Sequence, residues 1–179
     1  MYLSNNNTPA NQAYTFGAPA GIPGAISRAD ETSVEPAQLI ASGSPSATAQ
    51  AFGLAMVYAT GGITQWGGSN VAADFAGVLV RQAPGITDND SGLTGNIPEA
   101  AQIQGLLVRG YVTIYCGYGT PVRGQAPYVR TVATANNMNV GTFDATSDGS
   151  NNVQLSTTQA TWATDGKDAN NNAELRVYR

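Results

Sequence analysis

Residues 103–130 read IQGLLVRGYVTIYCGYGTPVRGQAPYVR, and the centre of this stretch alternates between two sets of side chains. One set is Val108, Gly110, Val112, Ile114 and Cys116, and the other is Arg109, Tyr111, Thr113 and Tyr115. Because successive side chains of a strand point to opposite faces, the alternation predicts a half-buried β-strand with the first set inward. Glycines and a proline at 117–121 end the strand, and PYVRTV at 127–132 begins another extended segment.

Further strands are predicted on both sides of this stretch. Residues 75–81 form a nearly continuous apolar run, which is typical of a strand covered on both faces. Residues 51–60 predict a strand or a short helix, and Gly53 with the glycines at 61–62 favours the strand because only about eight residues remain. The remaining extended segments are 27–40, 140–143, 153–162 and 173–178, with loops at 61–73, 82–101 and 165–172.

These segments predict an all-β chain of one domain. Its 179 residues suffice for a single core, and Ala, Gly, Ser, Thr and Asn are abundant, as expected for strands joined by many turns. Residues 1–27 are polar and rich in turn-forming residues, so they predict an extended N-terminal arm, followed by a body at 28–179. The pentapeptides GVLVR at 77–81 and GLLVR at 105–109 resemble each other. This similarity reflects either an internal repeat or the common composition of strands.

Charge and composition exclude several functions. The net charge is −4 without a basic cluster, so we expect no nucleic-acid or membrane partner. There is no histidine, which removes the commonest general base and zinc ligand. Cys116 is the only cysteine, and its inward phase predicts a buried core residue. No signal peptide or membrane span is expected, which favours synthesis in the cytoplasm.

Neither a metal site nor a catalytic site is predicted. The loop DNDSGLTGNIPE at 88–99 begins like a calcium loop, but Gly92 comes one position early and Leu93 stands where that loop needs glycine. Asp and Asn in the 144–151 turn fit local backbone bonding. Paired carboxylates of a glycosidase would need aromatic residues beside them, and no such grouping is visible. We therefore expect no enzyme, no cofactor and no metal.

A protein interface is the remaining candidate site. Tyrosines on the outward face of the 103–116 strand either anchor an interface or pack against a second sheet. Arg109, with Arg123 and Arg130, is a candidate to pair with the acidic 30–35 segment of the same or another subunit. The candidate interface residues are Tyr14, Phe16, Ile22, Pro23, Arg28, Arg109, Tyr111, Tyr115, Tyr118 and Arg123.

Several short motifs follow one another along the chain: GIPGAISRAD at 21–30, FAGVLVR at 75–81, LVRGYVTI at 107–114, PVRGQAPYVR at 121–130, GTF at 141–143, ATW at 160–162 and AELRV at 173–177. Their order resembles that of phage structural cement (capsid decoration) proteins. The resemblance implies a single antiparallel β-sandwich or jelly-roll-like body. It also implies a role on the outer surface of the phage head, bridging neighbouring major capsid protein subunits as a homo-oligomer, a dimer or a trimer. The alternative is a receptor- or glycan-binding β-domain of a phage tail or head fibre.

Overall fold

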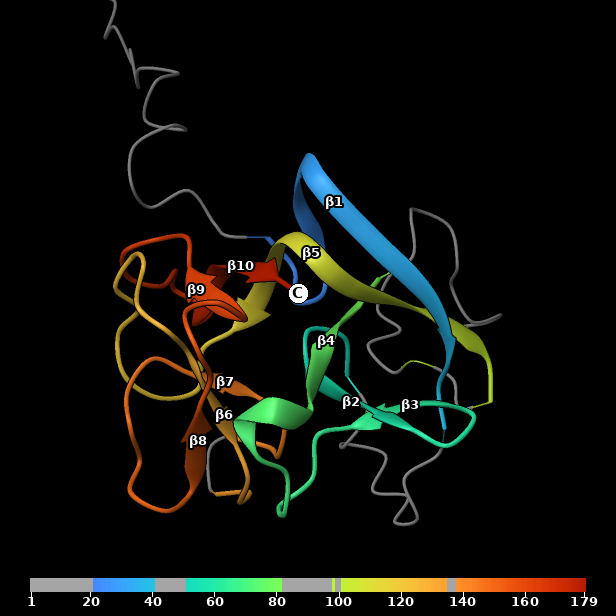
Figure 1. Cartoon of the computed structure of the whole chain (residues 1–179). Helices are drawn as coiled ribbons and strands as arrows, with labels where there is room; N and C mark the ends of the chain where they lie inside the picture. The colour runs from blue at the N-terminus through green and yellow to red at the C-terminus, as the bar shows by residue number, and fades with distance from the viewer. Residues whose placement is uncertain (1–20, 41–50, 82–97, 99–100, 135–137) are drawn as a thin grey trace, which may run out of the picture.

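The computed structural model describes residues 21–40, 51–81, 98, 101–134 and 138–179 (Figure 1). Its strands are β1 (Ile26–Gln38), β2 (Ala55–Ala59), β3 (Gly62–Gln65), β4 (Phe75–Val80), β5 (Ile103–Tyr115), β6 (Tyr128–Arg130), β7 (Phe143–Asp144), β8 (Asn152–Gln154), β9 (Ala160–Trp162) and β10 (Asn172–Tyr178). Among these residues the only helical element is one 3-10 turn, η2 (Ala72–Asp74). All strand pairs are antiparallel, so the predicted all-β class is confirmed.

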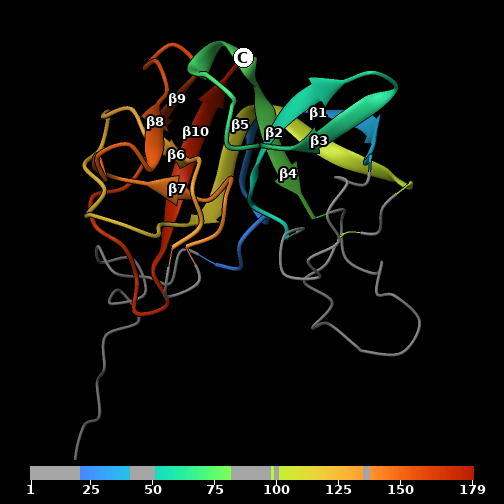
Figure 2. The same ribbon diagram turned by 90° about the horizontal axis from the view of Figure 1, so that it is seen from below.

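Strand β5 is the centre of the larger, seven-stranded sheet. Strand β1 pairs along one edge of β5, while β4 and β10 share the opposite edge end to end (Figures 1 and 2). Leu107 thus lies between β1 and β4, and Tyr111 lies between β1 and β10. The stretch with the clearest alternation in the sequence therefore pairs with three other strands.

The residues on the β4 side of β5 curl into a closed unit. Strand β4 pairs with β2 and β2 with β3, and Leu39 at the end of β1 forms a parallel bridge with Ile63 of β3. A Cβ atom at Gly62 would lie 2.1 Å from the Gln38 carbonyl oxygen, so only glycine permits this approach. Strand β3 lies in a segment predicted to be a loop, because four residues between glycines and a tryptophan give too short a pattern.

A smaller core cluster belongs to this closed unit. Its members are Leu39, Met56, Ile63, Ala76, Leu79, Leu106 and Val108. The side chains of β4 alternate between this cluster and a larger one, since Leu79 belongs to the smaller cluster and Val78 and Val80 to the larger. All six residues of β4 are consequently buried, which confirms the prediction of a strand covered on both faces.

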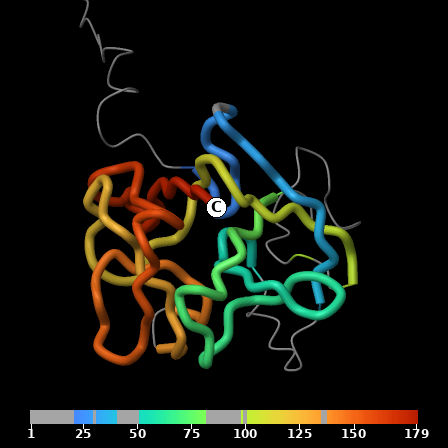
Figure 3. Tube along the Cα trace, in the orientation of Figure 1, coloured from blue at the N-terminus to red at the C-terminus, as the bar shows by residue number. Residues whose placement is uncertain are grey.

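The larger cluster lies between the seven-stranded sheet and the three-stranded sheet of β7, β6 and β8. The rings of Phe75 and Phe143 meet edge to face with centroids 6.4 Å apart, one from each sheet. Figure 3 shows most of the chain that follows β5 at the left of the body and residues 51–80 to the right of it. This layering confirms the predicted sandwich, whereas the jelly-roll-like topology stays a prediction.

The alternation of β5 changes phase between Val108 and Arg109, where consecutive residues Ser33 and Val34 of β1 pair with Arg109 and Leu107. Leu107 packs in the larger cluster and Val108 in the smaller, but Val112 and Ile114 pack in the larger one. Gly110 follows this irregularity with φ +128°, and a Cβ atom there would lie 3.2 Å from Thr32 Cα, so glycine suits this position. The prediction that Val108 shares an inward face with Val112 is therefore wrong.

The chain before β1 continues the pairing along the same edge of β5. The Gly24 amide donates to the Thr113 carbonyl oxygen at 2.8 Å, and the Thr113 amide donates to the Ala25 carbonyl oxygen at 2.9 Å. Thr113 was predicted to point outward and is only 1% exposed, because residues 21–25 cover it. The boundary between arm and body at residue 27 stays a prediction, and residues 21–27 contact the body.

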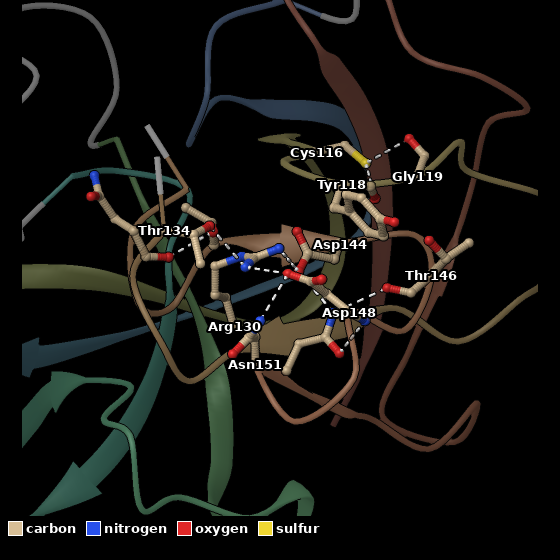
Figure 4. Close-up of polar contacts among 12 residues, drawn as sticks. Cys116, Tyr118, Gly119, Arg130, Thr134, Asp144, Thr146, Asp148 and Asn151 are labelled. Atoms are coloured by element: carbon tan, nitrogen blue, oxygen red, sulfur yellow. Dashed lines mark hydrogen bonds and ion pairs between the residues drawn. The ribbon is translucent and has the colours of Figure 1, made fainter. Parts of the chain in front are cut away.

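A buried ionic network supports the three-stranded sheet (Figure 4). Arg130 lies with one guanidinium nitrogen 2.7 Å from Asp144 Oδ2 and another 2.9 Å from Asp148 Oδ2, and both Arg130 and Asp144 are fully buried. Asn152 donates to Asp144 Oδ2 at 2.8 Å. Burial raises the pKa of the Asp144 carboxyl, while Asn152 and Arg130 oppose the rise. Arg130 therefore does not pair with the 30–35 segment, in contrast to the prediction.

Cys116 is expected to resist thiol reagents in the native protein. It is buried as predicted, and desolvation raises the pKa of its thiol to about 11. Since the thiolate is the reactive form, we expect alkylation by iodoacetamide near pH 8 to be slower than in the urea-unfolded chain by about 100-fold or more. Mass spectrometry of timed samples measures this ratio, and equal rates in the two states would contradict the burial of this side chain.

Candidate interaction surface

The outward side chains of β1, β5 and β10 form one continuous surface, which we name the Arg–Tyr face. It consists of Arg28, Arg109, Tyr111, Arg176 and Tyr178. The strand register creates it, because Arg28 of β1 and Arg176 of β10 both lie opposite Tyr111 of β5. The Arg28 guanidinium lies 4.4 Å from the Tyr111 ring centroid and that of Arg176 lies 5.1 Å from it. These cation–π contacts hold the ring and both guanidinium groups in place.

Two glutamates fix the arginines of this face. Arg28 and Glu174 form a two-pronged ion pair with Nε–Oε1 at 2.9 Å, and Ser27 Oγ donates to the same Oε1 at 2.6 Å. Arg176 lies 2.7 Å from Glu31, which raises the pKa of the Arg176 guanidinium. A bidentate guanidinium–carboxylate pair has a defined geometry, so this part of the surface is preorganised.

Arg109 is the most available cation of the face. It is 56% exposed, and its ion pair with Glu31 is long, at 3.9 Å. Exposed pairs of this length contribute little to stability, about 0–1 kcal/mol. The prediction that Arg109 pairs with the 30–35 segment is confirmed within one chain, and the guanidinium still has donors for a partner.

Other predicted interface residues come together in a pocket. Ile22, Pro23 and Tyr115 line it with Phe52, Leu54 and Arg81, and its volume is about 380 Å³. We name it the Tyr115 pocket. It lies on the same face of β5 as Tyr111, farther along the strand. Tyr111 and Tyr115 belong to the same alternating set, but Tyr111 lies in the Arg–Tyr face and Tyr115 lines the pocket.

The remaining candidate interface residues that the structure describes lie outside the Arg–Tyr face and the Tyr115 pocket. Tyr118 and Arg123 follow β5 on the connection to β6, and Arg123 has an ion pair with Asp165 at 3.8 Å. Both side chains are exposed. Tyr14 and Phe16 lie outside the described residues, as does most of the 88–99 loop. The structure therefore divides the predicted interface residues into the Arg–Tyr face, the Tyr115 pocket and the β5–β6 connection.

Arg176, Tyr178 and Glu174 were missed by the sequence reasoning, whereas Glu31 belongs to the acidic 30–35 segment that was expected to pair with Arg109. Their signal was present, since Glu174, Arg176 and Tyr178 alternate with the inward Leu175 and Val177. What the sequence lacked was the pairing of β10 with β5, which places this outward set beside Tyr111.

Other ligand sites were also considered. The described part of the chain holds no group of three or more Cys, Asp or Glu side chains placed to bind a metal ion. Within the same ranges, no helix is long and apolar enough to cross a membrane.

The described residues thus form a two-layered, all-β body with an outward Arg–Tyr face. The model of the family "Structural cement protein (E217 gp24/Pam3 gp6)" matches residues 10–178, so the chain belongs to this family of phage structural cement proteins. The family gives the chain a structural role in the phage capsid, as the resemblance implied.

The fold is also found in a solved capsid. A chain of "The capsid of Myoviridae Phage XM1" is similar with a TM-score of 0.61 and 15% sequence identity, covering 87% of this chain and 89% of that chain. At this identity the similarity shows a shared fold. No curated protein matches the chain.

Proposed function

We propose that the protein binds the outer surface of the assembled phage head and stabilises it by bridging neighbouring major capsid protein subunits. The Arg–Tyr face is the observation that carries this proposal. Arginine and tyrosine are enriched at the energetically dominant positions of protein interfaces, and here they are held by ion pairs on a sheet. A preorganised surface loses little conformational entropy on binding.

The stabilisation follows from mass action. A protein that binds the assembled lattice in preference to free subunits shifts the equilibrium towards the lattice. Contacts repeated by symmetry add up when geometry lets them engage together, which favours a homo-oligomer, a dimer or a trimer, on the head. In this proposal the protein acts without catalysis, after synthesis in the host cytoplasm.

Binding to heads that lack the protein tests the proposal. We expect regular icosahedral occupancy by electron cryo-microscopy and an increased melting temperature of the heads, with weak or no binding to unassembled major capsid protein. A handful of copies at one vertex, or binding to cell-surface glycans on an array, would instead support the fibre domain and overturn the cement function.

Replacing Arg109 with glutamate is expected to weaken head binding by about tenfold or more, because arginines in interface centres typically contribute over about 1 kcal/mol. The fold should persist, since the exposed Arg109–Glu31 pair contributes little. Titration of decorated heads measures the affinity, and circular dichroism checks the fold.

Arg123→Glu is the matched comparison for this substitution. Arg123 is 57% exposed and has one long ion pair at 3.8 Å, much like Arg109. We expect it to leave head binding within about twofold of the wild type. If Arg123→Glu weakens binding and Arg109→Glu does not, the β5–β6 connection is the contact and the Arg–Tyr face is not.

Deleting residues 1–20 is expected to leave a folded body and to weaken head attachment by about tenfold or more, because the predicted arm adds contacts that act together with those of the body. Thermal unfolding of the isolated protein and occupancy of heads are the two measurements. A collapse of the melting temperature would mean that these residues belong to the core.

A further inference from the structure

The Tyr115 pocket is lined by five separate parts of the chain, one of which is the β6–β7 connection with Asn139 and Thr142. Ile22 and Pro23 precede β1, Phe52 and Leu54 precede β2, and Tyr115 ends β5. Arg81 joins two of these parts, since its Nε donates to the Pro23 carbonyl oxygen at 3.0 Å and its guanidinium lies 4.9 Å from the Phe52 ring centroid. The pocket is therefore formed by packing of the body and does not need an occupant to exist.

The surface of this pocket is largely apolar. Isoleucine, proline, phenylalanine and leucine side chains form most of it, and Ile22 at its rim is 59% exposed. An apolar pocket of about 380 Å³ suits a hydrophobic or aromatic side chain, because covering apolar surface is favourable. A phenylalanine ring supplies a large apolar surface for such a pocket.

The start of the described chain lies beside this pocket. The Gly21 carbonyl oxygen accepts a hydrogen bond from Asn172 Nδ2 at 3.0 Å, and a Cβ atom at Gly21 would lie 3.2 Å from Thr113 Oγ1. Thr113 and Tyr115 are two residues apart on the same face of β5, roughly 7 Å along the strand. Residues 1–20 therefore join the body within reach of the pocket.

We propose that the Tyr115 pocket holds the aromatic ring of Phe16 from the same chain. Residues 1–20 carry no charged side chain, and their aromatic residues are Tyr2, Tyr14 and Phe16. Phe16 precedes Ile22 by six residues, which span at most about 20 Å. Gly17 and Pro19 between them are turn-forming residue types. Phe16 is preferred to Tyr14 because it is the aromatic residue of this segment nearest in sequence to Ile22.

The short connection favours the same chain over a second copy. Linking two binding groups by a short flexible segment gives an effective concentration in the millimolar range, far above the concentration of free protein in dilute solution. The inference does not depend on binding to the head, and its test uses the isolated full-length protein. Its failure would leave the cement function untouched.

Limited proteolysis with chymotrypsin tests the proposal. Chymotrypsin cleaves after aromatic residues, and its active site must accommodate the ring that the pocket would hold. Cleavage after Tyr2 in the same segment is the internal reference, and a synthetic peptide of residues 1–20 gives the intrinsic ratio of the two rates. We expect the ratio of cleavage after Phe16 to cleavage after Tyr2 to be at least about tenfold lower in the protein than in the peptide.

A substitution that fills the pocket is the matched variant. Ala51→Trp adds a large ring at a half-buried position of the lining and is expected to bring the ratio close to that of the peptide, with cleavage after Tyr2 unchanged. The wild-type ratio stands as a test even if this variant fails to fold. A ratio equal to that of the peptide would overturn the proposal. Protection that disappears on dilution would also overturn it, because the occupant would then come from a second copy.

Discussion

Replacing Arg130 with leucine is expected to lower the free energy of unfolding by about 3–5 kcal/mol, since removal of one partner leaves the other charge buried and uncompensated. Arg130 and Asp144 are both fully buried, and the guanidinium lies 2.7 Å from Asp144 Oδ2. Asn152 would remain as a hydrogen-bond donor to the carboxylate, but its amide carries no charge. Urea unfolding followed by circular dichroism measures the loss.

The loss should depend on pH and on Asp144. In the variant, burial holds the pKa of Asp144 above its unfolded value, so the folded state gains a proton as pH falls through that window. The deficit is therefore expected to be smaller near about pH 5 than near about pH 7.5. Adding Asp144→Leu should recover part of the stability, because replacing both members of a buried pair with apolar residues is often close to neutral. A double variant less stable than Arg130→Leu would contradict this account.

Replacing Trp162 with alanine is expected to cost about 3–5 kcal/mol, the range for deleting a large aromatic side chain from a core. Trp162 lies on β9 opposite Leu175 of β10 and is 1% exposed within the larger core cluster. Its loss would leave a cavity where β9 and β10 meet the three-stranded sheet. Urea unfolding at constant temperature measures the change.

Trp162→Phe separates the packing of the ring from its polar atom. The indole Nε1 of Trp162 is buried and has no hydrogen-bond partner among the described residues. Removing this N–H group breaks no hydrogen bond and removes a desolvated donor. The phenylalanine variant should therefore lose about half as much stability as the alanine variant, or less. An equal loss would show that Nε1 has a partner, such as a buried water molecule.

Alternation in the sequence predicted the strands at the centre of the larger sheet. Strand β5 was visible from its period of two, β4 from its apolar run and β10 from its inward Leu175 and Val177. These strands are long or fully buried, so several side chains report the same periodicity. Strand β3, with four residues, was missed because its position depends on the approach of Gln38 to Gly62, which is a tertiary contact.

The phase change in β5 was hidden for a different reason. The irregularity opposite Ser33 and Val34 places Val108 and Arg109 on the same side of the strand, and no local sequence pattern marks it. The sequence showed one alternating strand, whereas the structure has two core clusters on different faces of it. Only the positions of β4 and β10 reveal that the inward face changes between Val108 and Val112.

The sequence predicted three of the five residues of the Arg–Tyr face. Arg28, Arg109 and Tyr111 were identified on the correct strands, but the acid that holds Arg28 is Glu174, at a sequence separation of 146 residues. No local pattern connects residues so far apart. The same limit applies to Arg130, whose partners Asp144 and Asp148 follow it by 14 and 18 residues, in a turn whose sequence is typical of a surface loop.

The position of β5 in the sheet also determines when the protein becomes competent to bind. Its partners β1 and β10 are distant in sequence, and such non-local pairing slows folding, typically to milliseconds or seconds. During synthesis, β5 emerges from the ribosome before β10, and Arg28 has no Glu174 until that strand is made. Arg176 and Tyr178 also lie on β10 and are synthesised at the same stage as Glu174. A chain whose synthesis stops before β10 therefore lacks Arg176 and Tyr178, two of the five residues of the Arg–Tyr face.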